Sequence, residues 1–353
     1  MGLNMHMEVA GCPTVCKHCW AQGVPYGMMP LEDIRFALEG ARQFCDDAGI
    51  DFGSYPMHEI AAHPQAAEVM RLFREVCGDD FEPLPTTGVP FATRDDWREL
   101  ATAIGAQGTR HFWVAFHGLG AEHDALVSRD GAFQETLLAV ERVKCLGFRC
   151  GANVFVTREL AAQFEPMAET LQRLGLSGMA WDVARYYPTA RARQYEAHRP
   201  TLDDLRPISD RVRRLTIYGE VQWKNLEAYT EAAWVRKAMR DEWEAACQPW
   251  ELIPQEGVSL VCRPNLDVHT GEAGLYGQRH GNLKADGVAT TLRRAIDYGP
   301  RSKDSLYRLP DPLPSIAELA ERHGDPCGQA VYFEASSMRY RWLDRAAGKA
   351  GAA

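Results

Sequence analysis

The run Cys12-Pro-Thr-Val-Cys16-Lys-His-Cys19 decides the class of this chain, because three of its ten cysteines fall within eight residues. The spacing is C-x3-C-x2-C, and the run directly follows residues 6–10, which we expect to form a strand. Three thiolates can ligate three irons of a cubane [4Fe–4S] cluster and leave the fourth iron open. We therefore predict that Cys12, Cys16 and Cys19 bind such a cluster.

A zinc site is the alternative interpretation of the same run. Structural zinc takes four ligands and usually uses paired C-x2-C units, so His18 would have to supply the missing ligand. Ten cysteines in 353 residues are too few for a disulfide scaffold. We expect a reducing compartment and a cytoplasmic protein.

The composition is that of an ordinary globular enzyme, with 46% hydrophobic and 25% charged residues. The 39 Lys and Arg are outnumbered by 48 Asp and Glu and are scattered along the chain, which disfavours a nucleic-acid partner. Apolar stretches such as residues 151–156 are far too short to span a bilayer, and residues 1–7 do not resemble a signal peptide. We expect no membrane association.

Strands and helices are predicted to alternate through the first 220 residues. The further strands are expected at residues 112–116, 150–156 and 178–183, and the helices at 31–45, 132–146 and 160–174. Repeated strand–helix units indicate a parallel sheet covered by helices. We predict an α/β fold, a partial (β/α)6 TIM-like barrel over residues 1–220.

The pattern changes after about residue 217, which predicts a smaller C-terminal α+β cap domain over residues 221–353. A long amphipathic helix is expected at 225–246, followed by a β-rich segment beginning at 258–262. The Pro-rich stretch 309–314 predicts a surface connection before a last helix at 315–323, and residues 348–353 are expected to be disordered.

Several segments downstream of the cysteines match one family in the right order. Glu59 precedes a His63–Pro64 pair, Asn153 lies on a predicted strand, and Arg191 lies in Pro188-Thr-Ala-Arg-Ala192. Together with the cysteine run, and with His18 at the aromatic position before the third cysteine, the chain resembles the radical S-adenosylmethionine (AdoMet) superfamily. The resemblance implies that an electron from the cluster cleaves AdoMet to a 5′-deoxyadenosyl radical.

The resemblance also implies roles for individual residues. Glu59 would hold the AdoMet amino group, Asn153 its ribose or carboxylate, and Arg191 its carboxylate. The match departs from the family pattern around Glu59, where Met57 and His58 replace glycines and Ile60 replaces a proline. Asn153 could instead only satisfy backbone groups at a strand edge.

His117 stands where the family pattern has an aspartate, at the end of a predicted barrel strand. Functional groups gather at such strand ends, so His117 is a candidate for substrate contact or proton transfer. A structural histidine with satisfied hydrogen bonds is the alternative.

The C-terminal part resembles a SPASM or twitch extension, because Cys262-Arg-Pro-Asn-Leu and Gly281-Asn-Leu283 match the borders of its hairpin. An auxiliary cubane takes four protein thiolates, yet this domain holds only Cys247, Cys262 and Cys327, widely separated. We therefore expect a degenerate cap without an auxiliary cluster. A three-cysteine cluster completed by substrate or a histidine is the alternative.

The predicted function is hydrogen abstraction from a small-molecule precursor in natural-product biosynthesis, with a redox-neutral outcome such as epimerisation, rearrangement or bond formation. Cys262, like Cys247 and Cys327, is a candidate hydrogen donor for an epimerisation. The resemblance implies an external electron donor such as flavodoxin or ferredoxin. The alternatives are a peptide maturase, disfavoured because no leader-binding module precedes Cys12, and a non-enzymatic zinc or iron–sulfur protein.

Overall fold

The computed structural model describes residues 2–19, 21–25, 27–187, 189–247, 257–272, 275–298 and 314–348. The predicted Pro-rich connection, apart from its last residue, and the predicted disordered end, apart from its first, lie outside the described residues. In the described part, no helix is long and apolar enough to cross a membrane.

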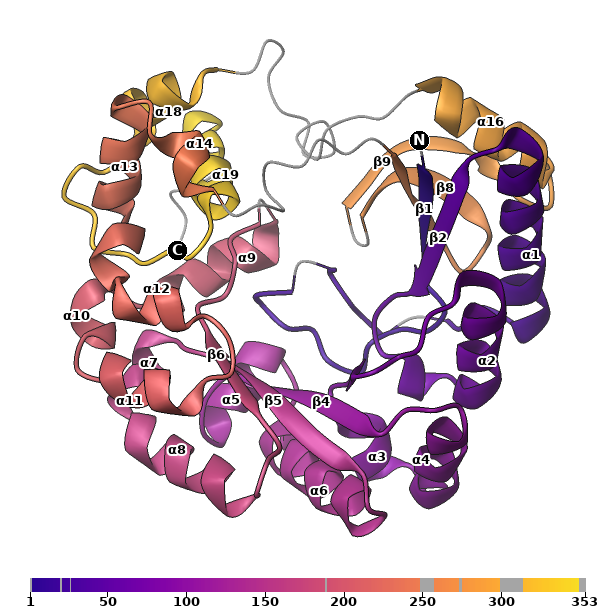
Figure 1. Cartoon of the computed structure of the whole chain (residues 1–353), viewed down its shortest axis with the longest axis horizontal. Coiled ribbons are helices and arrows are strands. Elements are labelled where there is room, and N and C mark those ends of the chain that lie inside the picture. The colour runs from indigo at the N-terminus through magenta and orange to yellow at the C-terminus, as the bar shows by residue number, and fades with distance from the viewer. Residues whose placement is uncertain are drawn as a thin grey trace.

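The predicted partial barrel is confirmed, and it is not closed. Strands β1 to β6 pair in parallel within two groups, β2–β1 and β3–β4–β5–β6, and no ladder joins β2 to β3 among the described strands. Figure 1 shows the strands as an arc around an open centre, with helices outside. The strands are β1 (Gly2–Met7), β2 (Asp51–Pro56), β3 (Leu84–Pro85), β4 (His111–Phe116), β5 (Arg149–Phe155) and β6 (Met179–Asp182).

The helices of this part cover the outer face of the arc because their apolar positions recur at helical spacing. In α1, for example, Ile34, Leu38 and Ala41 are fully buried, and the helix ends at Gly49, whose left-handed backbone suits glycine. The helices are α1 (Leu31–Ala48), η1 (Ile60–Ala62), α2 (Ala66–Cys77), α3 (Val89–Thr93), α4 (Trp97–Ala106), α5 (Ala121–Val127), α6 (Ala132–Cys145), α7 (Arg158–Ala162), α8 (Phe164–Arg173), α9 (Ala190–Tyr195), η2 (Glu196–His198), α10 (Leu202–Leu205), α11 (Ser209–Leu215) and α12 (Glu220–Lys224).

The first strand differs from its prediction at both ends. It covers Gly2–Met7, whereas residues 6–10 were expected. Leu3, Met5 and Met7 are buried on one face of the pleat, while Asn4 and His6 point to the other face, where Asn4 is exposed and His6 is buried. Beyond Met7 the chain turns, because the Val9 amide donates to the Met7 carbonyl, and the cysteine-bearing loop begins there.

The expected domain boundary near residue 220 does not separate two hydrophobic cores. Strand β7 (Val258–Cys262) pairs in parallel with β1, and it is followed by the antiparallel strands β8 (Asp267–Glu272) and β9 (Leu275–Asn282) and by helix α16 (Val288–Tyr298). Leu260, Val268 and Leu292 belong to the same core as β1. Residues 258–298 are therefore part of the barrel body.

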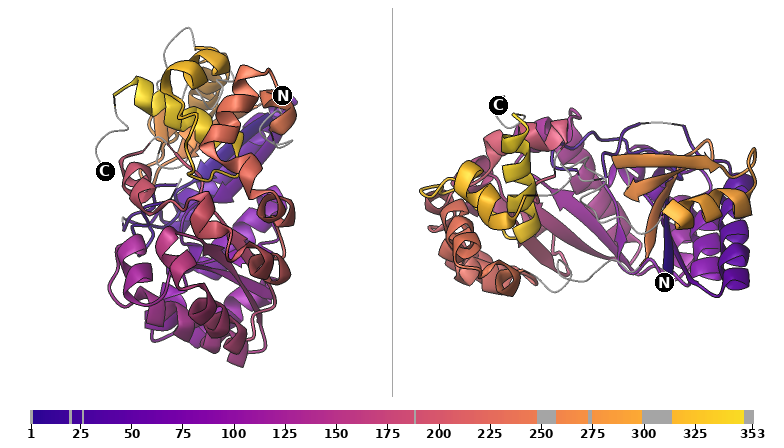
Figure 2. Two further views of the ribbon diagram at one scale, coloured as in Figure 1. Left: turned by 90° about the vertical axis from the view of Figure 1, so that its left-hand side faces the viewer. Right: turned by 90° about the horizontal axis from the view of Figure 1, so that it is seen from above.

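A second core lies in a helical unit at the opposite end of the molecule (Figures 1 and 2). Trp234, Leu319 and Trp342 are its central side chains. The expected single helix over 225–246 is wrong, because Thr230 starts a new helix by accepting a bond from the Ala233 amide. The unit contains η3 (Leu226–Tyr229), α13 (Glu231–Met239), α14 (Trp243–Ala246), α18 (Ile316–His323) and α19 (Ala335–Ala346).

Candidate metal centre

The three predicted cluster cysteines lie in the loop that leaves the carboxyl end of β1. Backbone bonds hold this loop in place, since the Cys12 amide donates to the Val24 carbonyl at 2.9 Å and the Val15 and Lys17 amides donate to Val127 and Leu126 at the end of α5. The loop is thus fixed between β1 and the helix that follows β4. This position is the mouth of the barrel, where such folds bind their ligands.

Two of the three thiols contact a buried hydroxyl. The Thr14 hydroxyl lies 3.2 Å from Cys12 Sγ and 3.3 Å from Cys16 Sγ, and all three cysteines are free. Gly23 packs against the loop so closely that a Cβ there would come within 2.8 Å of the Cys12 Cβ. Only glycine fits at that position while Cys12 keeps its place.

The ligand set of the loop suits a cluster better than one zinc ion. Sulfurs that share a tetrahedral zinc lie about 3.8 Å apart, given Zn–S bonds of about 2.3 Å. In the described part of the chain, Cys12, Cys16 and Cys19 do not form a set whose ligand atoms all lie within 4.8 Å of one another. Thiolates of a cubane sit on different irons, so these three thiols need not converge on one ion.

Burial makes the thiolate form of these cysteines depend on a metal. Burial, reinforced by Glu59, raises the pKa of Cys12 to about 11, and burial with the nearby Cys19 raises the pKa of Cys16 to about 12. Both thiols are protonated near neutral pH without a partner cation. Bound iron would supply that charge, so the donor set fits a cluster.

Glu59 lies beside this loop, after β2, and its side chain is 1% exposed. Its carboxylate accepts bonds from the Thr86 hydroxyl at 3.0 and 3.1 Å, from the Thr87 hydroxyl at 2.6 Å and from the Thr87 amide. Burial raises the pKa of Glu59, and these bonds partly offset the shift. His63 bonds the Met29 carbonyl and the Gln65 amide, so the His-Pro pair has a structural role.

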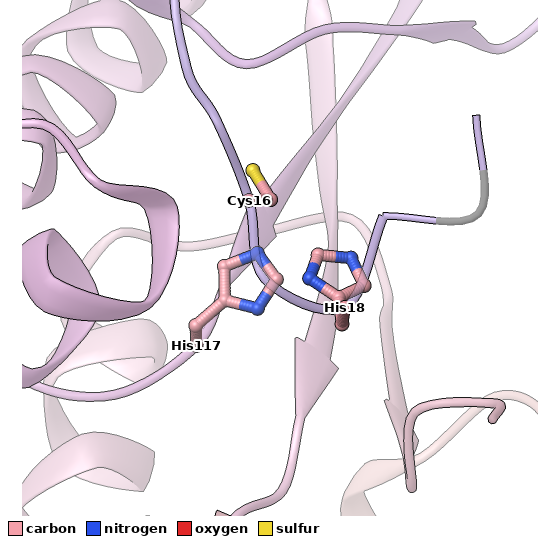
Figure 3. A group of neighbouring side chains, drawn as sticks. All are labelled: Cys16, His18 and His117. Carbon is pink, nitrogen blue, oxygen red and sulfur yellow. The ribbon is translucent and has the colours of Figure 1, made fainter. Parts of the chain in front are cut away.

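His117 lies directly after β4 and is 1% exposed. Its ring stacks on Phe155 at 5.0 Å between centroids with an angle of 9°, and it lies 4.3 Å from the His18 ring (Figure 3). The His117 amide donates to Nδ1 of His123 at 3.2 Å. Burial lowers the pKa of His117 well below its usual range and that of His18 to about 4, so both imidazoles are neutral.

Asn153 lies on β5 two residues before Phe155, so the pleat places both side chains on the same face of the sheet. Ala115 of β4 pairs with Asn153 and lies on that face as well. Since Phe155 contacts both His18 and His117, Asn153 belongs to the strand face that the cluster loop covers. Its expected contact with AdoMet stays a prediction.

Arg191, on α9, reaches the cluster loop from the far end of the arc. Its Nη1 donates to the Gly23 carbonyl at 2.8 Å. The same short helix is anchored from behind, because Arg193 donates to both Asp344 oxygens of α19 at 2.7 and 2.9 Å, and the Tyr186 hydroxyl donates to Asp344. The helical unit therefore helps to position Arg191.

Cys262, the predicted hydrogen donor, lies at the end of β7 and is fully buried. It pairs with Met7 of β1 and joins the main core on the face that carries Leu260. Burial raises the pKa of the Cys262 thiol. A donor must reach its substrate, so this placement argues against that role. Cys247 packs against the second core, and Cys327 is exposed.

Some site residues were not predicted from the sequence. Thr14 had a detectable signal, since a hydroxyl two residues from each of two metal-binding cysteines can bond both sulfurs. Thr86 and Thr87 had none, because their bonds to Glu59 cross 27 and 28 residues. Asp344 lies 151 residues from Arg193 and was equally hidden.

Comparisons with known proteins agree with this geometry, although no family model matches the chain. An AdoMet-dependent heme synthase of Oleidesulfovibrio alaskensis is 24% identical over 201 residues, 56% of this chain and 48% of that protein. The chain thus spans about half the length of the curated relative. The structure of native anSMEcpe with bound AdoMet has a TM-score of 0.52 at 12% identity and covers 98% of this chain and 97% of that one.

Streptococcus suis SuiB bound to precursor peptide SuiA has a TM-score of 0.50 at 11% identity and covers 96% of this chain and 76% of that one. At such identities these structures establish the fold alone. The curated relative is an AdoMet-dependent enzyme, and a cysteine loop at the mouth of a partial barrel is what the resemblance to the radical SAM superfamily predicts. The cofactors of this superfamily are a [4Fe–4S] cluster and AdoMet.

Proposed function

We propose that this chain uses a [4Fe–4S] cluster on Cys12, Cys16 and Cys19 to cleave AdoMet and abstract hydrogen from a substrate. The observation that carries the proposal is the loop itself: three free cysteines at the mouth of the barrel, with the buried carboxylate of Glu59 beside Cys12. When bound, the cluster supplies the electron that splits AdoMet into methionine and a 5′-deoxyadenosyl radical.

The chain's own residues hold AdoMet. Glu59 accepts hydrogen bonds from the AdoMet ammonium with a carboxylate that Thr86 and Thr87 fix in position. Arg191, tied to the Gly23 carbonyl, pairs with the AdoMet carboxylate. Asn153 contacts the ribose or carboxylate from the face of β5.

His18 and His117 form one wall of this site. Both rings pack on Phe155, and their neutral imidazoles add no positive charge beside the cluster loop. His117 follows β4 directly and can contact a substrate or relay a proton there.

The substrate we propose is a small molecule. We also propose a redox-neutral outcome, because the widely separated Cys247, Cys262 and Cys327 are too few to hold an auxiliary cluster that could accept an electron from the substrate. A peptide is the second candidate, supported by the fold shared with SuiB bound to its precursor peptide. Incubating the reconstituted enzyme with candidate substrates deuterated at single positions distinguishes them. Deuterium must appear in 5′-deoxyadenosine with the true substrate.

The test of the activity is anaerobic reconstitution with iron and sulfide, followed by AdoMet and dithionite. We expect 5′-deoxyadenosine and methionine in equal amounts, and none from the Cys19→Ala variant. Cys77→Ala is the matched control, since Cys77 lies in helix α2, away from the loop, and its loss should leave product formation intact. Product from Cys19→Ala at the wild-type rate would exclude the proposed cluster.

A further inference from the structure

One thiol of the cluster loop also belongs to a second, more compact set of metal ligands. Ligand atoms of Cys16, His18 and His117 all lie within 4.8 Å of one another, which is the only such set among the residues that the structure describes. Figure 3 shows the two rings side by side with the Cys16 side chain next to them. One thiolate and two imidazoles are a donor set that suits borderline divalent ions such as Zn²⁺.

Each of the two imidazoles has a ring nitrogen that takes part in no hydrogen bond within the described part of the chain. Nδ1 of His18 and Nδ1 of His117 are buried and have no hydrogen-bond partner within the described part of the chain. A buried polar atom left unbonded costs about 1–3 kcal/mol, so such atoms call for an explanation. A metal ion that accepts the nitrogen lone pair provides one.

The rings are also held in place before any ion arrives. His117 is 1% exposed and stacks on Phe155, while the His18 ring lies 4.5 Å from the same phenyl group. The backbone amide of His117 is fixed by its bond to His123. Two ligands whose orientation is set by packing lose little conformational entropy on binding.

There is room beside these ligands for a fourth. A small pocket borders Cys16 and His117, and its wall also includes the hydroxyls of Thr14, Thr87 and Thr136. Sites with three protein ligands keep an open position for water, and this pocket provides the space.

We propose that Cys16, His18 and His117 form a single-ion site for a divalent transition metal of the zinc type, and that this ion competes with the iron–sulfur cluster for Cys16. The ion displaces the thiol proton and takes one lone pair from each imidazole. With Cys16 committed, only Cys12 and Cys19 remain in the loop, too few for the cluster. The proposal does not depend on AdoMet cleavage.

The test uses the metal-free full-length chain, reduced and kept anaerobic, titrated with Co²⁺ as a spectroscopic substitute for Zn²⁺. We expect one Co²⁺ per chain, with thiolate-to-metal charge transfer and four-coordinate ligand-field bands. His117→Gln and His18→Phe should each weaken Co²⁺ binding at least about tenfold, since even an outer-shell partner is worth that much. The phenyl ring in His18→Phe preserves the packing on Phe155.

Two controls separate this site from the cluster. Cys19→Ala should bind Co²⁺ like the wild type although it cannot assemble the cluster, and His117→Gln should still take up about four irons per chain. His111→Gln removes an imidazole at the opposite end of β4, outside the ligand set and the pocket, and should leave the affinity unchanged. Zn²⁺ added before iron and sulfide should block cluster assembly in the wild type but not in His117→Gln.

The proposal is overturned if the wild type binds no Co²⁺, or if neither histidine variant weakens binding. It is also overturned if Cys19→Ala abolishes binding, because the ion would then sit on the three thiols. Circular dichroism of each variant shows whether it folds, and His18→Phe decides the matter if His117→Gln does not.

Discussion

Replacing Glu59 by glutamine separates the charge of this side chain from its hydrogen bonds. Oε2 of Glu59 accepts bonds from Thr86 and Thr87, and a glutamine carbonyl of the same shape can accept them too. The variant therefore loses the carboxylate charge that we propose binds the AdoMet ammonium. A hydrogen bond to a charged group is worth about 1.5–3 kcal/mol. At 1.4 kcal/mol per factor of ten, AdoMet should bind about 10- to 150-fold more weakly.

Equilibrium dialysis of AdoMet against reconstituted protein measures this change, with iron content determined on the same samples. Glu122→Gln is the matched control, because Glu122 is a partly buried glutamate that accepts a side-chain bond from Gln163 at 2.6 Å. Its AdoMet affinity should equal that of the wild type. If Glu59→Gln, with full iron content, binds AdoMet within about twofold of the wild type, the proposed role of Glu59 is wrong.

Three further outcomes are expected. Gly23→Ala should lower the iron content of the reconstituted protein, because its Cβ would come within 2.8 Å of a cluster-loop cysteine, whereas Gly27→Ala, with nothing within 4 Å, should not; equal iron contents would contradict this. Asp344→Asn should lower the free energy of unfolding in urea by about 3 kcal/mol, because it breaks the ion pair of a buried carboxylate with Arg193. Asp210→Asn, which breaks an exposed ion pair, should lower it by at most about 1 kcal/mol. Similar losses in the two variants would refute the proposed contribution of the Asp344–Arg193 pair. Burial raises the pKa of Glu59, so its carboxylate takes up a proton at a higher pH than an ordinary glutamate does. AdoMet affinity should therefore begin to fall at that higher pH on acidification. If the Glu59→Gln variant shows the same pH profile as the wild type, another group is responsible for it.

The alternation of strands and helices was predictable because each element carries its own period. Ile34, Leu38 and Ala41 recur at helical spacing and are buried in α1. Residues 112–116 were expected as a strand, and β4 covers His111–Phe116. The ends of the elements were less predictable. For example, β1 ends at a turn, and the Glu8 amide there donates a hydrogen bond to the carbonyl of Cys262, a residue far away in the chain.

The pairing of β7 with β1, which joins residues 258–262 to the core of the first part, was not predictable from local pattern. Leu3 pairs with Val258, and nothing in either segment specifies the other. The three cysteines could be proposed as ligands from the sequence because they follow the C-x3-C-x2-C pattern, and their binding of a cluster stays a prediction. The supporting contacts, such as Arg193 with Asp344, depend on tertiary packing and were found only in the structure.

The central claim is that Cys12, Cys16 and Cys19 hold a cluster whose fourth iron binds AdoMet. Electron paramagnetic resonance of the dithionite-reduced, reconstituted protein tests it most directly, recorded with and without AdoMet. We predict the signal of one reduced [4Fe–4S] cluster per chain, with g values that shift when AdoMet is added. A cluster signal that AdoMet leaves unchanged at saturating concentration, or no cluster signal at all, would contradict the claim.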